Sequence, residues 1–153
     1  MSNTLYNQDF HAWAFQQATL LREGKLAQAD IENIAEEIES MGRGERRELT
    51  NRLTVLLMDL LKWRHQPIRR GRGWELTIKG QRRETRLHLR DNPSLKPWLD
   101  QAMDDAYGSA AIKAARETRL DVFPAICPFT FEQAIDDDFW PSTCSPSTCS
   151  PSI

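Results

Sequence analysis

The stretch from Asp30 to Pro67 limits the fold of this chain more than any other, because it is built from helical repeats and ends at a proline. Apolar residues recur every three or four positions over residues 30–41, which predicts an amphipathic helix capped by Asp30. Leucines then cover a wide arc from about Glu45 to His65, which predicts the central helix of the core. We expect a break between these two helices at Gly42-Arg43-Gly44, and a helix end just before Pro67.

Helical periodicity continues on both sides of this stretch. Before it, a helix that ends near Gly24 has one predicted inward face, made of Phe10, Trp13, Ala14, Gln17, Leu20 and Leu21. After it, helices are expected over about Trp74–Arg90 and Lys96–Thr118, the latter burying Trp98 among small residues. Thr130 and Gln133 have the spacing of a capping box for a short last helix. The sequence therefore predicts an all-α fold, a single compact helical bundle of about five to six helices.

Composition sets the limits of this bundle. We expect one helical domain over residues 5–141, followed by a disordered low-complexity tail, 142–153, in which the letters STCSP occur twice. Cys144 and Cys149 lie in that tail without histidine nearby, so their spacing is only a weak metal or disulfide signal. Cys127, between an isoleucine and a proline, is predicted to be a buried, inert thiol.

The apolar segments are too short for a membrane span. The longest, Leu53–Leu61, is interrupted by Thr54 and Asp59, whereas a spanning helix needs about 20 apolar residues. The first ten residues also lack the basic and apolar regions of a secretion signal. We expect a soluble, cytoplasmic protein with no membrane partner.

Six motifs in order carry a resemblance: DFHAW, IENIAEEIESMGRGERREL, LLMDLLKWRHQP, the run from Trp74 that contains QRR, NPSL, and CPFTFEQAIDDDFWP. Together they resemble the bacterial family known as domain-of-unknown-function family 29, over about residues 5–141. The resemblance implies an all-helical fold and no assigned catalytic residues. The chain departs from the family pattern at Gly44, where serine is common, and at Asp59, where histidine is common, so a metal-ligand role at position 59 is not supported by the resemblance.

Charge is distributed unevenly along the chain. The net charge of −2 conceals a block of +8 over residues 62–90, between segments of −4 before it and −6 after it. Four cations of this block recur at helical spacing on one face of the expected helix, and three more occupy the glycine-rich turn before it. These residues are the candidate binding surface: Arg69, Arg70, Arg72, Lys79, Arg83, Arg86 and Arg90.

Three functions are compatible with these features. The first is a non-catalytic helical interaction module, in which the basic block, residues 62–90, meets an acidic surface on a protein partner or a second copy. The second is association with nucleic acid through the basic stripe, although the isoelectric point of about 5.9 is low for a dedicated nucleic-acid domain. The third is a metal-dependent enzyme. We expect no cofactor, and the chain lacks a Gly-x-Ser-x-Gly nucleophile motif.

The metal hypothesis depends on an acidic helix face. Glu32, Glu36 and Glu39 share one side of a helix and could hold a divalent cation if Asp59, His65 or His88 came close. The sequence has no Glu-x-x-His pair of the kind that di-iron bundles use, so we favour a solvated acidic face paired with Arg43, Arg46 and Arg47. His65, at a helix C-terminus, is interpreted as a charged imidazole that stabilises the helix end.

Overall fold

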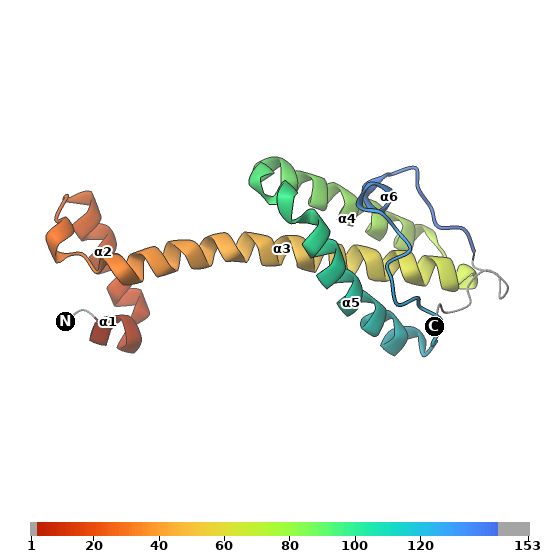
Figure 1. Cartoon of the computed structure of the whole chain (residues 1–153), viewed down its shortest axis with the longest axis horizontal. Coiled ribbons are helices and arrows are strands. Elements are labelled where there is room, and N and C mark those ends of the chain that lie inside the picture. Colours follow the sequence, from red (N-terminus) through yellow and green to blue (C-terminus); the bar gives the residue numbers. More distant parts are fainter. Residues whose placement is uncertain (1–2, 144–153) are drawn as a thin grey trace. The chain divides into compact units, whose positions relative to one another are not determined.

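A computed structural model describes residues 3–143, and every regular element in that range is helical (Figure 1). This range contains six α-helices and no strand, so the predicted all-α class is confirmed. The helices belong to two compact units, Met1–Gly44 and Glu45–Ile153. The expected tail lies outside the described residues from position 144 onward.

Helix α3 runs without interruption from Ile31 to His65, so the predicted break at Gly42-Arg43-Gly44 is wrong. Glycine lowers helix stability by about 1 kcal/mol relative to alanine but leaves the backbone hydrogen bonds intact. Arg43 adds support, because its guanidinium lies 2.8 Å from the Glu36 carboxylate and 3.7 Å from that of Glu39. The proline at position 67 does end the helix, as expected, because proline disfavours helical geometry in the residue before it.

The first unit consists of α1 (Asn3–Gln8), α2 (Phe10–Arg22), a 3₁₀ turn η1 (Leu26–Gln28) and the start of α3. Polar bonds join its helices: the Trp13 indole donates to Asp30 at 3.1 Å, and the Asp30 backbone N–H donates to Gln17 at 2.7 Å. The Tyr6 hydroxyl donates to the Glu37 carboxylate. These contacts leave Trp13 and Gln17 buried, each with 3% of its surface exposed.

The predicted inward face of α2 is only partly buried. Trp13 and Gln17 are covered, whereas Phe10 and Leu21 keep 50% and 42% of their surfaces exposed. A unit of this size has too few opposing side chains to cover a whole helix face. Gly24 has φ +71°, the left-handed conformation expected of it at the helix C-terminus.

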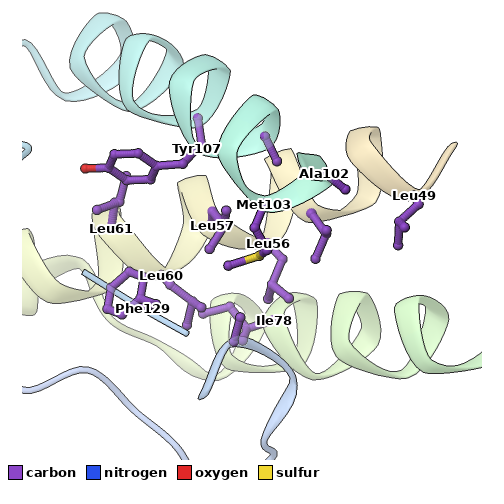
Figure 2. Close-up of a cluster of buried hydrophobic side chains, with 14 of the residues drawn as sticks. Leu49, Leu56, Leu57, Leu60, Leu61, Ile78, Ala102, Met103, Tyr107 and Phe129 are labelled. Carbon is purple, nitrogen blue, oxygen red and sulfur yellow. The ribbon is translucent and has the colours of Figure 1, made fainter. Parts of the chain in front are cut away.

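The second unit holds the main core (Figures 1 and 2). Around the later part of α3 lie α4 (Arg72–Asp91), α5 (Leu99–Thr118) and the short α6 (Phe131–Ile135), with 3₁₀ turns η2 (Pro67–Arg69) and η3 (Pro93–Trp98). Leucines of α3 gather with Ile78 of α4 and with Met103 and Tyr107 of α5. Six of these leucines have no exposed surface, as the leucine arc predicted: Leu49, Leu53, Leu56, Leu57, Leu60 and Leu61.

The beginning of α5 differs from the prediction. Residues 93–98 form the 3₁₀ turn η3, and α5 itself starts at Leu99. Trp98, which we expected to be buried, is 41% exposed, and the Arg46 guanidinium lies 3.8 Å from the centre of its ring. A cation over an indole face is favourable at a partly exposed site, so Trp98 covers α3 from outside the core.

The chain after α5 is held by side chains that donate to its backbone carbonyls. Arg82 of α4 is fully buried and donates from Nε to Ala134 O at 2.8 Å and from Nη2 to Phe139 O at 2.6 Å. The Tyr107 hydroxyl donates to Pro124 O. The predicted capping box of Thr130 and Gln133 is confirmed at the start of α6. Residues with few backbone partners of their own are therefore fixed by donors from α4 and α5.

We predict that Arg82→Met destabilises the protein by about 2–4 kcal/mol, because two buried carbonyls would lose their donors. Urea unfolding followed by circular dichroism and tryptophan fluorescence measures the loss. Arg83→Met is the matched control, since Arg83 is exposed and has no hydrogen bond or ion pair within residues 3–143; its cost should stay within about 0.5 kcal/mol. Equal losses for the two variants would contradict the role of Arg82.

Candidate functional site

The cations expected on α4 differ in what they contact. Lys79 pairs with Glu75 at 3.2 Å and Arg90 with Asp91 at 3.1 Å, both within the same helix. Arg86 donates to Ile135 O at 2.7 Å and pairs with Asp137 at 3.0 Å. Arg83 has no such partner in the described part of the chain. These four residues, the basic stripe, share one face of α4. Two of them pair within the helix, one contacts the segment after α5, and Arg83 forms no ion pair with any described residue.

The three arginines of the turn before α4 also differ in their contacts and burial. The Arg70 Nε donates to Trp63 O at 2.7 Å, its guanidinium lies 5.1 Å from the Trp63 ring centre, and burial lowers its pKa. Arg72 pairs with Glu75 at 3.2 Å. Arg69 is exposed and forms no ion pair with any residue from 3 to 143. Arg70 is therefore part of the packing around Trp63, whereas Arg69 points to solvent.

A groove in the second unit brings two members of the stripe together with a cation that the sequence did not single out. Arg86 and Arg90 of α4 and Lys96 of η3 line a groove of about 560 Å³. Lys96 is exposed and has no ion pair among the described residues. Three positive charges around one groove favour an anionic occupant.

Apolar side chains form the rest of the groove. They come from four elements, namely Leu89 of α4, Pro93 of η3, Leu99 of α5 and the pair Phe131 and Ile135 of α6. Phe131 and Ile135 are four residues apart, so the short helix presents both on one side. A molecule that combines acidic groups with apolar side chains, as one face of an amphipathic segment does, would match both parts of this lining.

The local sequence explains why these elements meet. Asn92 ends α4, and Pro93 begins the 3₁₀ turn that returns the chain to α5 and carries Lys96. Arg86 fixes the end of α6 by donating to Ile135 O, one helical turn from the buried Arg82. The groove is built on positions that hydrogen bonds hold in place.

A neighbouring hollow has the opposite charge. It has a volume of about 590 Å³ and shares Lys96, Leu99 and Phe131 with the groove, but its other charged residues are Asp100, Asp104 and Glu132. Carboxylates on this side disfavour an acidic occupant. The part of the surface suited to an acidic segment is therefore confined to the side of α4.

The first unit exposes apolar and acidic side chains, the opposite in charge to the cations of the groove. Ile31, Ile38 and Met41, which we name the α3 stripe, are 50%, 63% and 71% exposed. At 100° per residue these three positions lie on one face of the helix. Glu32 and Glu39 follow Ile31 and Ile38 directly in the sequence, so each lies about 100° around the helix from its isoleucine, on the side away from Met41, and both are exposed. The amphipathic pattern predicted for residues 30–41 is present, but its apolar side is not covered by the unit that contains it.

Two of the three glutamates considered as metal ligands have an arginine partner. Glu36 and Glu39 pair with Arg43, as expected, whereas Arg46 lies over Trp98 instead of meeting this face. His88 Nε2 lies 2.9 Å from Glu45 O. Across residues 3–143, His, Cys, Asp and Glu side chains do not gather in a group of three that could hold a metal ion.

Two titratable groups of the second unit have shifted pKa values. Asp59, which interrupts the apolar run of α3, is 6% exposed, and burial raises its pKa to about 6, with Lys62 lowering it and Glu117 raising it. His65 packs its ring against Phe123, and burial, together with Arg64, lowers its pKa, which favours the neutral imidazole. The lowered pKa works against the charged imidazole that we expected at the helix end.

Cys127 is less buried than we expected, but its thiol has a raised pKa. It is half-buried, its thiol donates to Phe129 O at 3.3 Å, and burial raises its pKa. The thiolate is the reactive form of cysteine, so a raised pKa lowers its reactivity.

The chain is an all-helical protein whose second unit carries a groove lined by both cationic and apolar side chains. The family model for domain of unknown function DUF29 matches residues 5–140, and the chain belongs to that family. Neither the curated proteins nor the solved structures contain a match to this chain. Among the helices of residues 3–143, none combines the length and the apolar character needed to cross a membrane.

Asp59 makes the stability of the protein depend on pH in a defined direction. Its pKa is about 6 in the folded chain, against an ordinary value of 3.8, so the folded state binds the proton more tightly. Stability should therefore fall as the pH rises from about 4 to about 6. Asp59→Asn should reduce this fall and stabilise the protein at pH 8 by on the order of 1–2 kcal/mol.

Urea unfolding at about pH 3.5, about pH 6 and about pH 8 brackets this titration and measures the effect. Asp121→Asn is the control, because it removes an exposed carboxylate outside the core. A pH dependence that is the same in the wild type and in Asp59→Asn would show that Asp59 does not cause it.

Proposed function

We propose that this protein is a non-catalytic helical interaction module that captures an acidic, amphipathic protein segment in the groove of the second unit. The observation that carries the proposal is the combination of three cations, Arg86, Arg90 and Lys96, with an apolar lining in one groove. Charge attracts and orients an acidic segment, and apolar burial then retains it.

The arrangement of the cations supports protein capture. Arg90 and Lys96 can turn toward an occupant at small cost, because within residues 3–143 Arg90 pairs only with its neighbour Asp91 and exposed ion pairs contribute little. The apolar side chains of the groove would bury against leucine or isoleucine of a helix laid along it. A phosphate backbone has no apolar face to fill this part of the site.

Nucleic-acid association through the basic stripe of α4 remains a prediction from the sequence. The residue that favours it is Arg83, which is exposed and has no ion pair with any described residue. Titration of a labelled oligonucleotide with the protein, followed by fluorescence anisotropy, tests this prediction. Binding lost in Arg83→Glu but kept in a groove variant would favour nucleic acid over protein capture.

We predict that a labelled synthetic peptide of Glu, Ala and Leu, with leucines at helical spacing, binds the full chain. The double variant Arg90→Glu, Lys96→Glu should weaken binding by about tenfold or more, because two attractive charges become repulsive. Fluorescence anisotropy measures the dissociation constant. Arg86 is left unchanged, since it also holds the end of α6.

The matched control is Arg69→Glu, Arg83→Glu, which makes the same change in net charge at two exposed arginines outside the groove. A second control peptide replaces every Glu with Lys. Equal weakening by the two double variants, or equal binding of the acidic and basic peptides, would contradict the groove as the binding site.

A further inference from the structure

We infer that the segment captured by the groove is the α3 stripe of a second copy of this chain, with its acidic flank. This inference rests on the proposed function of the groove and names its occupant. Ile31, Ile38 and Met41 of one copy would meet the apolar lining of the groove, while Glu32 and Glu39 of that copy would face Arg90 and Lys96 of the other.

Charge complementarity is the first argument. Residues 1–44 carry seven acidic and three basic side chains, whereas residues 62–90 carry a net charge of +8. Glu32 has no ion pair among the described residues, and the Glu39 carboxylate is 3.7 Å from Arg43 at its closest. Both carboxylates are exposed and available to a cation on another molecule.

The exposure of the α3 stripe is the second argument. Its three side chains are at least half exposed, although they alternate with polar positions at the period of a helix that packs on something. Their neighbours on the inner side of the helix are engaged within the unit, as the bond from Tyr6 to Glu37 indicates. A stripe at i, i+7 and i+10 has the spacing with which a helix anchors itself in an apolar groove.

Both surfaces lie on one chain, so two copies can make two such contacts at once. The stripe of the first copy meets the groove of the second, and the stripe of the second meets the groove of the first. Two such contacts related by a two-fold axis close the pair, so the expected assembly is a dimer.

The experiment is sedimentation velocity of the full chain over about 1–200 µM protein at about 50 and 300 mM salt, which brackets strong and weak screening. We expect a dimer whose dissociation constant rises with salt. Glu32→Lys, Glu39→Lys and, separately, Arg90→Glu, Lys96→Glu should each raise it by about tenfold or more, since each makes like charges face one another.

An equimolar mixture of the two charge-reversal variants tests directly whether the α3 stripe and the groove face each other. In an equimolar mixture each interface again joins opposite charges, so the mixed pair should dimerise where neither variant does alone. Arg69→Glu, Arg83→Glu should dimerise like the wild type. Ile38→Gln, Met41→Gln should weaken the dimer without altering its salt dependence, because this variant removes only apolar contact.

The outcomes separate this inference from the proposed function. A chain that stays monomeric at every concentration but binds the Glu–Leu peptide overturns the second copy as occupant and leaves the groove as a site for another protein. A monomeric chain that does not bind the peptide overturns both. A dimer that both charge variants leave unchanged overturns the inference as well.

Discussion

The second unit depends on one buried guanidinium. Arg82 lies on the side of α4 that faces the core, and two of its nitrogens donate to the carbonyls of Ala134 and Phe139. Its guanidinium also lies 5.1 Å from the centre of the Trp140 ring. A buried charge is costly unless hydrogen bonds satisfy it, so this side chain specifies where the chain after α5 must run.

The groove exists because that path is fixed. Phe131 and Ile135 reach it only because α6 is placed against α4, and Arg86 holds Ile135 O one turn after Arg82 holds Ala134 O. The capping box of Thr130 and Gln133 then gives a five-residue helix a defined start. A groove with cationic and apolar walls thus arises where two arginines of one helix hold a segment with little regular structure of its own.

Helical periodicity predicted much of this fold. The leucine arc of residues 45–65, the end before Pro67 and the capping box at Thr130 all have local causes, and each is present in the structure. The sequence did not reveal that α3 continues through Gly42 and Gly44, because glycine is compatible both with a break and with a helix stabilised by Arg43. Phe10 and Leu21 were misplaced because periodicity identifies an apolar face without indicating whether anything covers it.

The groove was harder to predict than the helices. Arg83, Arg86 and Arg90 share a helical spacing, but only contacts made across the fold distinguish Arg86 and Arg90 from Arg83. Lys96 lies outside the basic block and joins the groove through the turn at Pro93. Arg82 was counted as one cation among ten over residues 62–90, and nothing in its neighbours indicated burial.

Arg86 has two roles, since it lines the groove and also donates a hydrogen bond to the backbone of α6. Any molecule that draws its guanidinium into the groove competes with Ile135 and Asp137, and any molecule that braces it there tightens their hold. Thermodynamic linkage makes this effect reciprocal: whatever loosens the end of the domain alters affinity in the groove by the same free energy. A ligand that contacts Arg86 in the groove would therefore change the stability of the end of α6.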